Sequence, residues 1–151
     1  MSLVKAAGSF ILGKTVTTEF ASGNPNITRN PHNLEYTPGG SSSGSAAAVA
    51  DFMVPYSFGT QTAGSMVRPA AFCGVSAIKP SFGTLSRAGL SYVADSLDTI
   101  GWFARDVKDL GIIFHALTGK DIKWNVDHEI RQLKIGICKT PDWDSADTPQ
   151  Y

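Results

Sequence analysis

Cysteine is scarce in this sequence. Of 151 residues, only Cys73 and Cys138 are cysteines, and they are not in C-x-x-C spacing. Two isolated cysteines cannot form a disulfide framework, and they lack the ligand spacing of a structural zinc site. We therefore expect both to be buried thiols in a reducing compartment.

Neither sign of charge predominates, and no long apolar run occurs. Thirteen basic residues balance thirteen acidic ones, so nothing favours nucleic acid or an anionic membrane. No apolar stretch approaches the roughly 18 residues of a membrane span, and residues 1–8 lack the apolar core of a signal peptide. We expect a cytoplasmic protein with neither nucleic-acid nor membrane partners. Hydrophobic residues at 42% and charged residues at 17% are typical of a globular domain.

Short apolar runs alternate with helical patterns along the chain. Residues 1–7 resemble the end of a helix, and residues 24–38, rich in Asn, Pro and Thr, resemble a loop. Short apolar runs predict strands at 10–12, 54–58, 75–78 and 133–138. This alternation predicts an α/β architecture of layered helices and strands. The Asp- and Pro-rich residues 140–151 show no period and are expected to be a flexible tail.

The clearest helical pattern covers residues 107–117. Apolar residues recur there at helical spacing, at Val107, Leu110, Ile113, Phe114 and Leu117. Asp106 is expected to be the N-cap and Gly119 the C-cap.

Two loops of small residues carry the chemically interesting serines. Residues 38–45 read Pro-Gly-Gly-Ser-Ser-Ser-Gly-Ser and lead into the alanine-rich 46–50, which predicts a loop entering a buried helix. Such a stretch alone is more typical of a linker, and it is neither a P-loop nor a dinucleotide fingerprint. The second loop, 59–68, places Ser65 after small residues and before an Arg-Pro helix start. It can expose several backbone N–H groups around one hydroxyl, as acyl transfer requires.

These segments together resemble the amidase-signature family. The resemblance rests on residues 38–50, 59–74 and 78–80, with 12–15, 19–21, 97–101 and 104–107 in support. It covers about residues 6–119 and, more loosely, the chain up to Cys138. It implies a fragment of the amidase-signature fold, an α/β fold with a mixed central sheet layered with helices. It also implies a serine amidase that hydrolyses linear amides through an acyl-enzyme, with a small-molecule amide substrate and no cofactor or metal.

The resemblance also assigns roles to individual residues. It makes Ser65 the acylated nucleophile and Ser41 the bridging serine, which follows a cis peptide bond and relays the proton. The oxyanion hole is assigned to Thr62, Ala63, Gly64 and Ser65. Ser42, Thr60 and Arg68 are assigned supporting positions. Ser43 and Ala63 stand where the family usually has glycine, and Gln61 replaces a frequent aspartate, which can alter the support of the loop.

The third member of the family's triad is a neutral lysine, whose pKa must be lowered by burial. The family carries it well upstream of the bridging serine, and here only Lys5 and Lys14 precede Ser41. Lys14 belongs to a different motif, Leu-Gly-Lys-Thr. We therefore expect residues 1–151 to be one partial amidase domain, without the N-terminal lysine region and the C-terminal part of the fold, and inactive in isolation. Its truncated faces are expected to favour self-association.

Three functional interpretations remain open: an amidase, the A-type subunit of a glutamine-dependent amidotransferase, and a non-catalytic remnant of the fold. Gln61 and Ala63 favour a stand-alone amidase. A Ser-His-Asp triad using His32, His115 or His128 is disfavoured because residues 63–67 do not form the G-x-S-x-G elbow. Asp98 is interpreted as a turn residue. The three tryptophans are interpreted as core or loop anchors: Trp102, Trp124 and Trp143.

Overall fold

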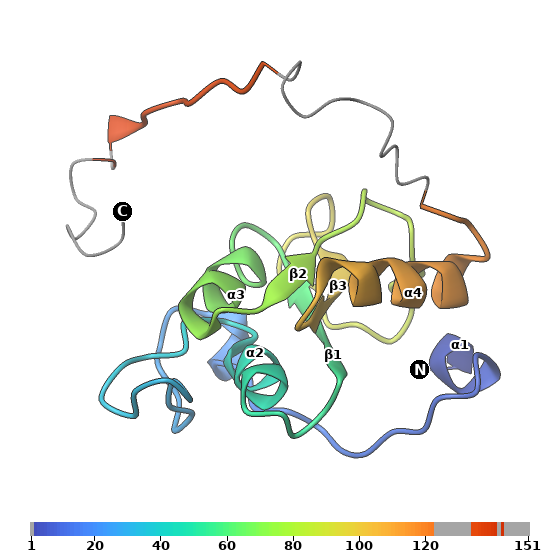
Figure 1. Cartoon of the computed structure of the whole chain (residues 1–151), viewed down its shortest axis with the longest axis horizontal. Coiled ribbons are helices and arrows are strands. Elements are labelled where there is room, and N and C mark those ends of the chain that lie inside the picture. The colour runs from blue at the N-terminus through green and yellow to red at the C-terminus, as the bar shows by residue number, and fades with distance from the viewer. Residues whose placement is uncertain (1, 123–133, 142, 144–151) are drawn as a thin grey trace.

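The computed structural model describes residues 2–122, 134–141 and 143, and Figure 1 shows the whole chain. Its helical elements are α1 (Ser2–Ala6), the 3-10 turn η1 (Glu19–Ala21), α2 (Ser43–Ala50), α3 (Val67–Cys73) and α4 (Val107–Thr118). Its strands are β1 (Tyr56–Gln61), β2 (Ser76–Ile78) and β3 (Thr99–Ala104).

The three strands form one antiparallel sheet in the order β1-β3-β2. β3 is the central strand, and Trp102 lies opposite Phe58 on β1 and opposite Ile78 on β2. Helices pack against this sheet, so the predicted α/β class of the fold is confirmed.

Successive side chains of β3 point to opposite faces of the sheet, and each face has its own apolar cluster. Phe103 belongs to a cluster with residues of α2 and α3, whereas Trp102 and Ala104 belong to a cluster with residues of α4 and α1. Thus α2 and α3 cover one face, and α4 with α1 covers the other (Figure 1). We call these the α2/α3 face and the α4 face.

The helix predicted from the apolar period is confirmed as α4. Asp106 caps it, because Asp106 Oδ1 accepts a hydrogen bond of 2.6 Å from the Lys108 N–H. Gly119 ends it in the left-handed conformation, with φ of +68°. The helix expected after the serine loop is also confirmed: it is α2, whose residues 43–49 are all buried.

The strand predicted at 10–12 is wrong. Residues 10–18 form no strand, and the Phe10 side chain is 83% exposed. The segment instead crosses the start of α2, where Val16 O accepts the Gly44 N–H at 2.9 Å. Its apolar residues therefore have no sheet neighbour with which to pair.

The predicted strand at 133–138 is also wrong over residues 134–138, which form no strand and expose Ile135 and Ile137. Leu133 lies outside the described residues, as do Trp124, His128 and most of the predicted tail. Cys138 is exposed rather than buried, whereas Cys73 is buried as predicted.

Two other strands were predicted with shifted bounds, and one was missed. The strand predicted at 54–58 is β1, which begins later and continues into the segment interpreted as loop. The strand predicted at 75–78 is β2. The central strand β3 was not predicted, because its sequence, Thr-Ile-Gly-Trp-Phe-Ala, is buried on both faces and has no alternating pattern.

In the part of the chain that the structure describes, no helix is long and apolar enough to cross a bilayer.

Candidate active site

The serine loop is held between the N-terminal segment and α2. The peptide bond between Gly40 and Ser41 is cis. Ser41 is 2% exposed, and its carbonyl oxygen accepts hydrogen bonds of 3.0 Å from both Thr18 N–H and the Thr17 hydroxyl. Ser41 is therefore fixed through its main chain, and within the described residues its hydroxyl makes no hydrogen bond.

The second serine lies between β1 and α3. Ser65 is half-buried. Four consecutive main-chain N–H groups, those of Thr62, Ala63, Gly64 and Ser65, donate to no acceptor within the described residues. Such a run of free donors beside a hydroxyl is suited to holding an oxygen that gains negative charge.

Direct hydrogen bonds join the two serine loops. The Ser42 N–H donates to Ser65 O at 3.1 Å. Arg68 Nε, from the first turn of α3, donates to Gly40 O at 3.0 Å. The chain therefore brings the loop of Ser41 and the loop of Ser65 into contact, although they lie on different elements.

Ser42 also ties the site to β1. Its hydroxyl lies 3.3 Å from Thr60 O and 3.4 Å from Thr60 N. This approach requires glycine at position 59, because a Cβ there would lie 2.7 Å from Ser42 Oγ. Of the residues assigned supporting positions, Ser42 and Thr60 contact each other, and Arg68 contacts the serine loop.

Gln61 supports the loop of Ser65 from the end of β1. Its side-chain oxygen accepts hydrogen bonds from Met66 N–H at 2.8 Å and Val67 N–H at 3.0 Å. These donors belong to the start of α3, where the first N–H groups have no partner inside the helix. The replacement of the family's aspartate by glutamine therefore leaves the loop supported, by a neutral oxygen.

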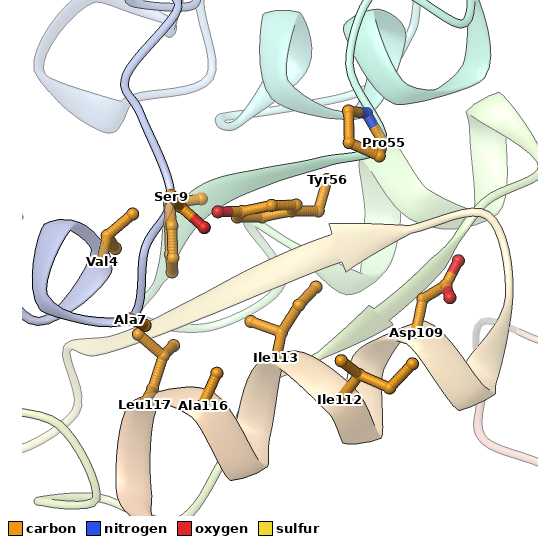
Figure 2. A pocket seen from close by; sticks show the side chains of 11 residues that line it. Val4, Ala7, Ser9, Pro55, Tyr56, Asp109, Ile112, Ile113, Ala116 and Leu117 are labelled. Atoms are coloured by element: carbon orange, nitrogen blue, oxygen red, sulfur yellow. The ribbon is translucent and has the colours of Figure 1, made fainter.

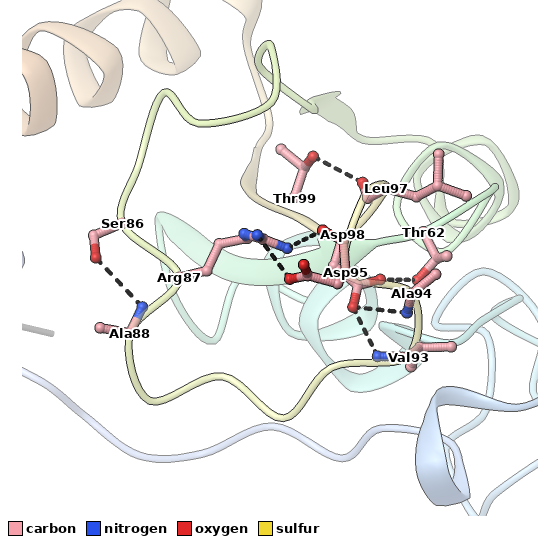
Figure 3. A network of polar contacts seen from close by, with 10 residues as sticks. All are labelled: Thr62, Ser86, Arg87, Ala88, Val93, Ala94, Asp95, Leu97, Asp98 and Thr99. Atoms are coloured by element: carbon pink, nitrogen blue, oxygen red, sulfur yellow. Dashed lines mark hydrogen bonds and ion pairs between the residues drawn. The ribbon is translucent and has the colours of Figure 1, made fainter.

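A carboxylate that the sequence did not reveal lies beside the loop of Ser65. Asp98, just before β3, is 3% exposed, and its Oδ1 accepts a hydrogen bond from the Thr62 hydroxyl. Its Oδ2 accepts from the N–H groups of Val93 and Ala94, as Figure 3 shows. Burial alone would raise the pKa of Asp98, but these three hydrogen bonds and the charge of Arg87 outweigh it and hold the pKa below its ordinary value.

The remaining serines of the loop bond to the scaffold. Ser45 Oγ donates to Phe58 O at 2.7 Å and lies 2.6 Å from Thr15 Oγ1. Ser43 Oγ accepts from Asn26 Nδ2 at 2.6 Å. Composition alone does not distinguish these serines from Ser41; the family resemblance does so, and their different partners in the fold agree with it.

Other candidate bases lie away from both serines. Lys14 is exposed, and within the described residues no lysine amine hydrogen-bonds to either serine. His32 Nε2 lies 2.9 Å from Cys73 O, and His115 pairs with Asp121 at 2.8 Å. The described histidines therefore have other partners, which agrees with the argument against a Ser-His-Asp triad.

A cavity of about 300 Å³ lies elsewhere, between α1, the start of β1, and α4 (Figure 2). Its lining is mainly apolar and includes the charged side chain of Asp109. It contains none of the residues that the resemblance assigns to the active site. The serine loops, not this cavity, therefore carry the candidate chemistry.

Comparisons with known proteins agree on one family. The family model described as Amidase matches residues 1–149. The A-type subunit of the glutamyl-tRNA(Gln) amidotransferase of Legionella pneumophila (strain Corby) is 45% identical over 146 residues, which cover 91% of this chain and 30% of the relative. The chain therefore spans about 30% of the length of the curated relatives it matches.

Two solved structures of similar sequence share the fold. The native peptide amidase of Stenotrophomonas maltophilia is 40% identical, with a TM-score of 0.72 over 80% of this chain and 27% of that chain. The A-type subunit of the glutamyl-tRNA(Gln) amidotransferase of Thermotoga maritima is 43% identical, with a TM-score of 0.73 over 80% of this chain and 28% of that chain.

Proposed function

The chain belongs to the amidase family, and from that premise we propose that it carries the two serines of an amide-hydrolysing active site. Ser65 is the nucleophile and Ser41 the bridging serine. The N–H groups of residues 62–65 form the oxyanion hole, and a small carboxamide is the substrate.

One observation carries this proposal: the four consecutive free N–H groups that end at Ser65. Buried or half-buried main-chain donors are rarely left without an acceptor. Their neighbours Met66 and Val67 have an acceptor in Gln61. The free N–H groups therefore lie directly beside the Ser65 hydroxyl, which supports an oxyanion hole at this place.

The reaction follows from these groups. The Ser65 hydroxyl gives up its proton through Ser41 and attacks the carbonyl carbon of the amide. The carbonyl oxygen becomes an oxyanion, and the free N–H groups stabilise it; one such donor typically lowers the barrier by about 3–4 kcal/mol. The proton returns through Ser41 to the leaving nitrogen, the C–N bond of the tetrahedral intermediate breaks, and a neutral amine or ammonia is released. Water then attacks the acyl-enzyme and frees the acid and Ser65.

The proton from Ser41 needs a base, and the family uses a lysine for this step. Lys5 and Lys14 do not fill that role in the proposal. We therefore expect the 151-residue chain by itself to turn over amides slowly or not at all. Its two serines and the free N–H groups are the parts that this chain supplies.

The test is selective acylation with a small fluorophosphonate at pH 9, where bulk hydroxide can assist. Peptide mapping is expected to find the label at Ser65 in preference to every other serine. Ser65→Ala should abolish it, and Ser41→Ala should slow it. Ser91→Ala, which alters an exposed serine outside both loops, should leave the rate unchanged. Labelling spread over many serines, or unaltered in Ser65→Ala, would refute the proposal.

A second candidate function is the glutaminase step of an A-type amidotransferase subunit. It is favoured by the relative that shares 45% identity and carries that name. The identities of 40% to a peptide amidase and 43% to an amidotransferase chain do not separate the two functions. Ammonia release from glutamine, compared with ammonia release from a simple aliphatic amide, distinguishes them. Hydrolysis of neither would favour a non-catalytic remnant.

A further inference from the structure

Asp98 joins three segments of the chain through one buried carboxylate. Its Oδ1 accepts from Thr62 Oγ1, and its Oδ2 accepts from Val93 N–H at 2.7 Å and Ala94 N–H at 3.0 Å (Figure 3). Asp98 itself immediately precedes β3. Both carboxylate oxygens are thus used to hold other parts of the chain.

One of these parts is the segment of free N–H groups. The ladder between β1 and β3 ends at the pair Gln61 and Thr99, so Thr62 and Asp98 are the next residues on each strand. Because residues 62–65 donate no main-chain N–H bond within the described residues, the ladder does not hold them. The hydroxyl of Thr62 is the contact that fixes the first of them.

The other part is the loop of residues 81–98, which contains neither helix nor strand. Loops of this length inside a compact domain are commonly functional. Arg87 holds its middle: the guanidinium pairs with Asp95 at 3.0 Å and stacks over the rings of Phe82 and Tyr92. Asp98 bonds to the end of this loop and to Thr62, so one residue holds both the loop and the segment of free N–H groups.

Resting on the proposed function, we propose that Asp98 is a positioning residue for the oxyanion hole. It acts through the Thr62 hydroxyl, and it couples the order of loop 81–98 to the placement of the free N–H groups. The substrate does not touch Asp98. Its loss therefore affects the stabilisation of the reacting oxygen more than the binding of a small ligand.

Two variants separate the contacts of Asp98. Asp98→Asn keeps an oxygen that can accept from Val93 and Ala94, but offers Thr62 an amide in place of the carboxylate acceptor. Asp98→Ala removes every contact. Asp51→Asn is the matched control, because it makes the same chemical change at an exposed aspartate outside loop 81–98.

The measurement is the fluorophosphonate reaction at Ser65, resolved into the maximal rate of inactivation and the half-saturating concentration. Asp98→Asn is expected to lower the maximal rate about tenfold or more, with little change in half-saturation, since misplaced donors stabilise the oxyanion less. Asp51→Asn should leave both constants unchanged. An unchanged maximal rate in Asp98→Asn, or an equal fall in Asp51→Asn, would overturn the inference.

Backbone NMR order parameters give a readout that is independent of the chemistry. Those of Thr62 and Ala63 are expected to fall in both Asp98 variants, and those of Val93 and Ala94 to fall in Asp98→Ala alone. Rigid values at Thr62 in a folded Asp98→Ala would also overturn the inference. Failure of wild-type Ser65 to be labelled would instead count against the proposed function, and the order parameters would still decide whether Asp98 positions Thr62.

Discussion

The two faces of the sheet are built from different residues. On β1, the side chains toward the α4 face include Tyr56 and Phe58. The Phe58 ring contacts the rings of Tyr56 and Trp102 edge-to-face, and the Trp102 ring packs at a tilt against Phe114. The alternate side chains, toward the α2/α3 face, are those of Ser57, Gly59 and Gln61. On β1, large apolar side chains therefore face α4, whereas small residues with polar contacts face α2 and α3, where Phe103 and Met66 supply the large apolar groups.

This difference explains how the chain brings the two serine loops together. A face of large side chains keeps helices apart by their bulk, whereas glycine and serine let backbones approach each other. Ser45 Oγ reaches Phe58 O, Ser57 Oγ donates to Ser45 O at 2.7 Å, and Ser42 reaches Thr60. We infer that the α4 face is held by apolar packing, and that the α2/α3 face adds close backbone contacts, which set the geometry, to apolar packing of its own.

The α4 face is tested most strongly at Trp102. It is fully buried, and its Nε1 donates to Leu110 O at 3.1 Å. Trp102→Ala is expected to lower the free energy of unfolding by about 3–5 kcal/mol, a large part of the stability of a small domain. Urea denaturation measures it. Ile112→Ala on α4, 66% exposed, is the control and should change stability by less than about 0.5 kcal/mol. Similar losses for both variants would contradict this account of the α4 face.

The close approach on the α2/α3 face is tested at Gly44. A Cβ there would lie 2.6 Å from Val16 N and 2.7 Å from Val16 O, which are backbone atoms and cannot rotate away. Gly44→Ala is therefore expected to destabilise by about 1–3 kcal/mol, although alanine favours a helix over glycine by roughly 0.5–1 kcal/mol.

Gly13→Ala provides the matched control for Gly44, since no atom lies within 4 Å of its added Cβ. Gly13→Ala should leave stability unchanged or raise it by up to about 1 kcal/mol, because alanine lowers the conformational entropy of the unfolded chain. Both melting midpoints can be followed by circular dichroism. If Gly44→Ala proved as stable as Gly13→Ala, close packing of residue 16 on α2 would not be what holds this face.

The sequence predicted the two faces unequally, for a physical reason. The α4 helix has a regular apolar period and caps at Asp106 and Gly119, so its bounds were predicted almost to the residue. The α2 helix has no apolar period, because nearly every side of it is buried, and it was predicted from the polar loop that leads into an alanine-rich segment rather than from periodicity. Local periodicity detects elements with one buried side, and it missed β3 for the same reason.

The candidate site shows the same limit. The resemblance gave roles to Ser41 and Ser65, but nothing local in the sequence connects Asp98 with Thr62, which lie 36 residues apart. Asp98 was interpreted as a turn residue, and it does order the turn at Val93 and Ala94. Its contact with Thr62 exists only because β1 and β3 pair in the sheet, a fact that depends on the strand that was missed.

The polar contacts of the α2/α3 face are tested at Ser45. Ser45→Ala removes the donor to Phe58 O and the contact with Thr15 Oγ1. A loss of about 1–2 kcal/mol is expected, because a partly buried carbonyl is left unpaired. Ser96→Ala, at an exposed position, should stay within about 0.5 kcal/mol of wild type in the same urea titration. If Ser45→Ala were as stable as Ser96→Ala, the serine contacts would add nothing to stability, and the apolar packing of Phe103 and its neighbours alone would stabilise the α2/α3 face.

The smallest expected effect concerns the reactivity of the two thiols, which reports how well the packing of the α2/α3 face excludes a small reagent. Cys73 is fully buried in the apolar cluster of that face, and burial raises its pKa to about 11. Cys138 is exposed and is the control within the same molecule. At pH 8 the thiolate fraction of Cys73 is lower by a factor of roughly 200 than that of a thiol with the ordinary pKa of about 8.5, and burial slows access further. Iodoacetamide at pH 8, followed by mass spectrometry, should therefore modify Cys138 more than about 100-fold faster.

The same shift in pKa predicts the direction of a pH effect. The folded chain keeps the Cys73 proton to higher pH than the unfolded chain, whose thiol loses it near pH 8.5. Stability from this group is therefore complete below about pH 8.5 and declines as the pH rises towards 11. Cys73→Ala should flatten the stability curve in that window and Cys138→Ala should not. Equal alkylation of the two thiols at pH 8 would mean that the α2/α3 face opens readily, and that the placement of Ser41 and Ser65 depends on something outside this packing.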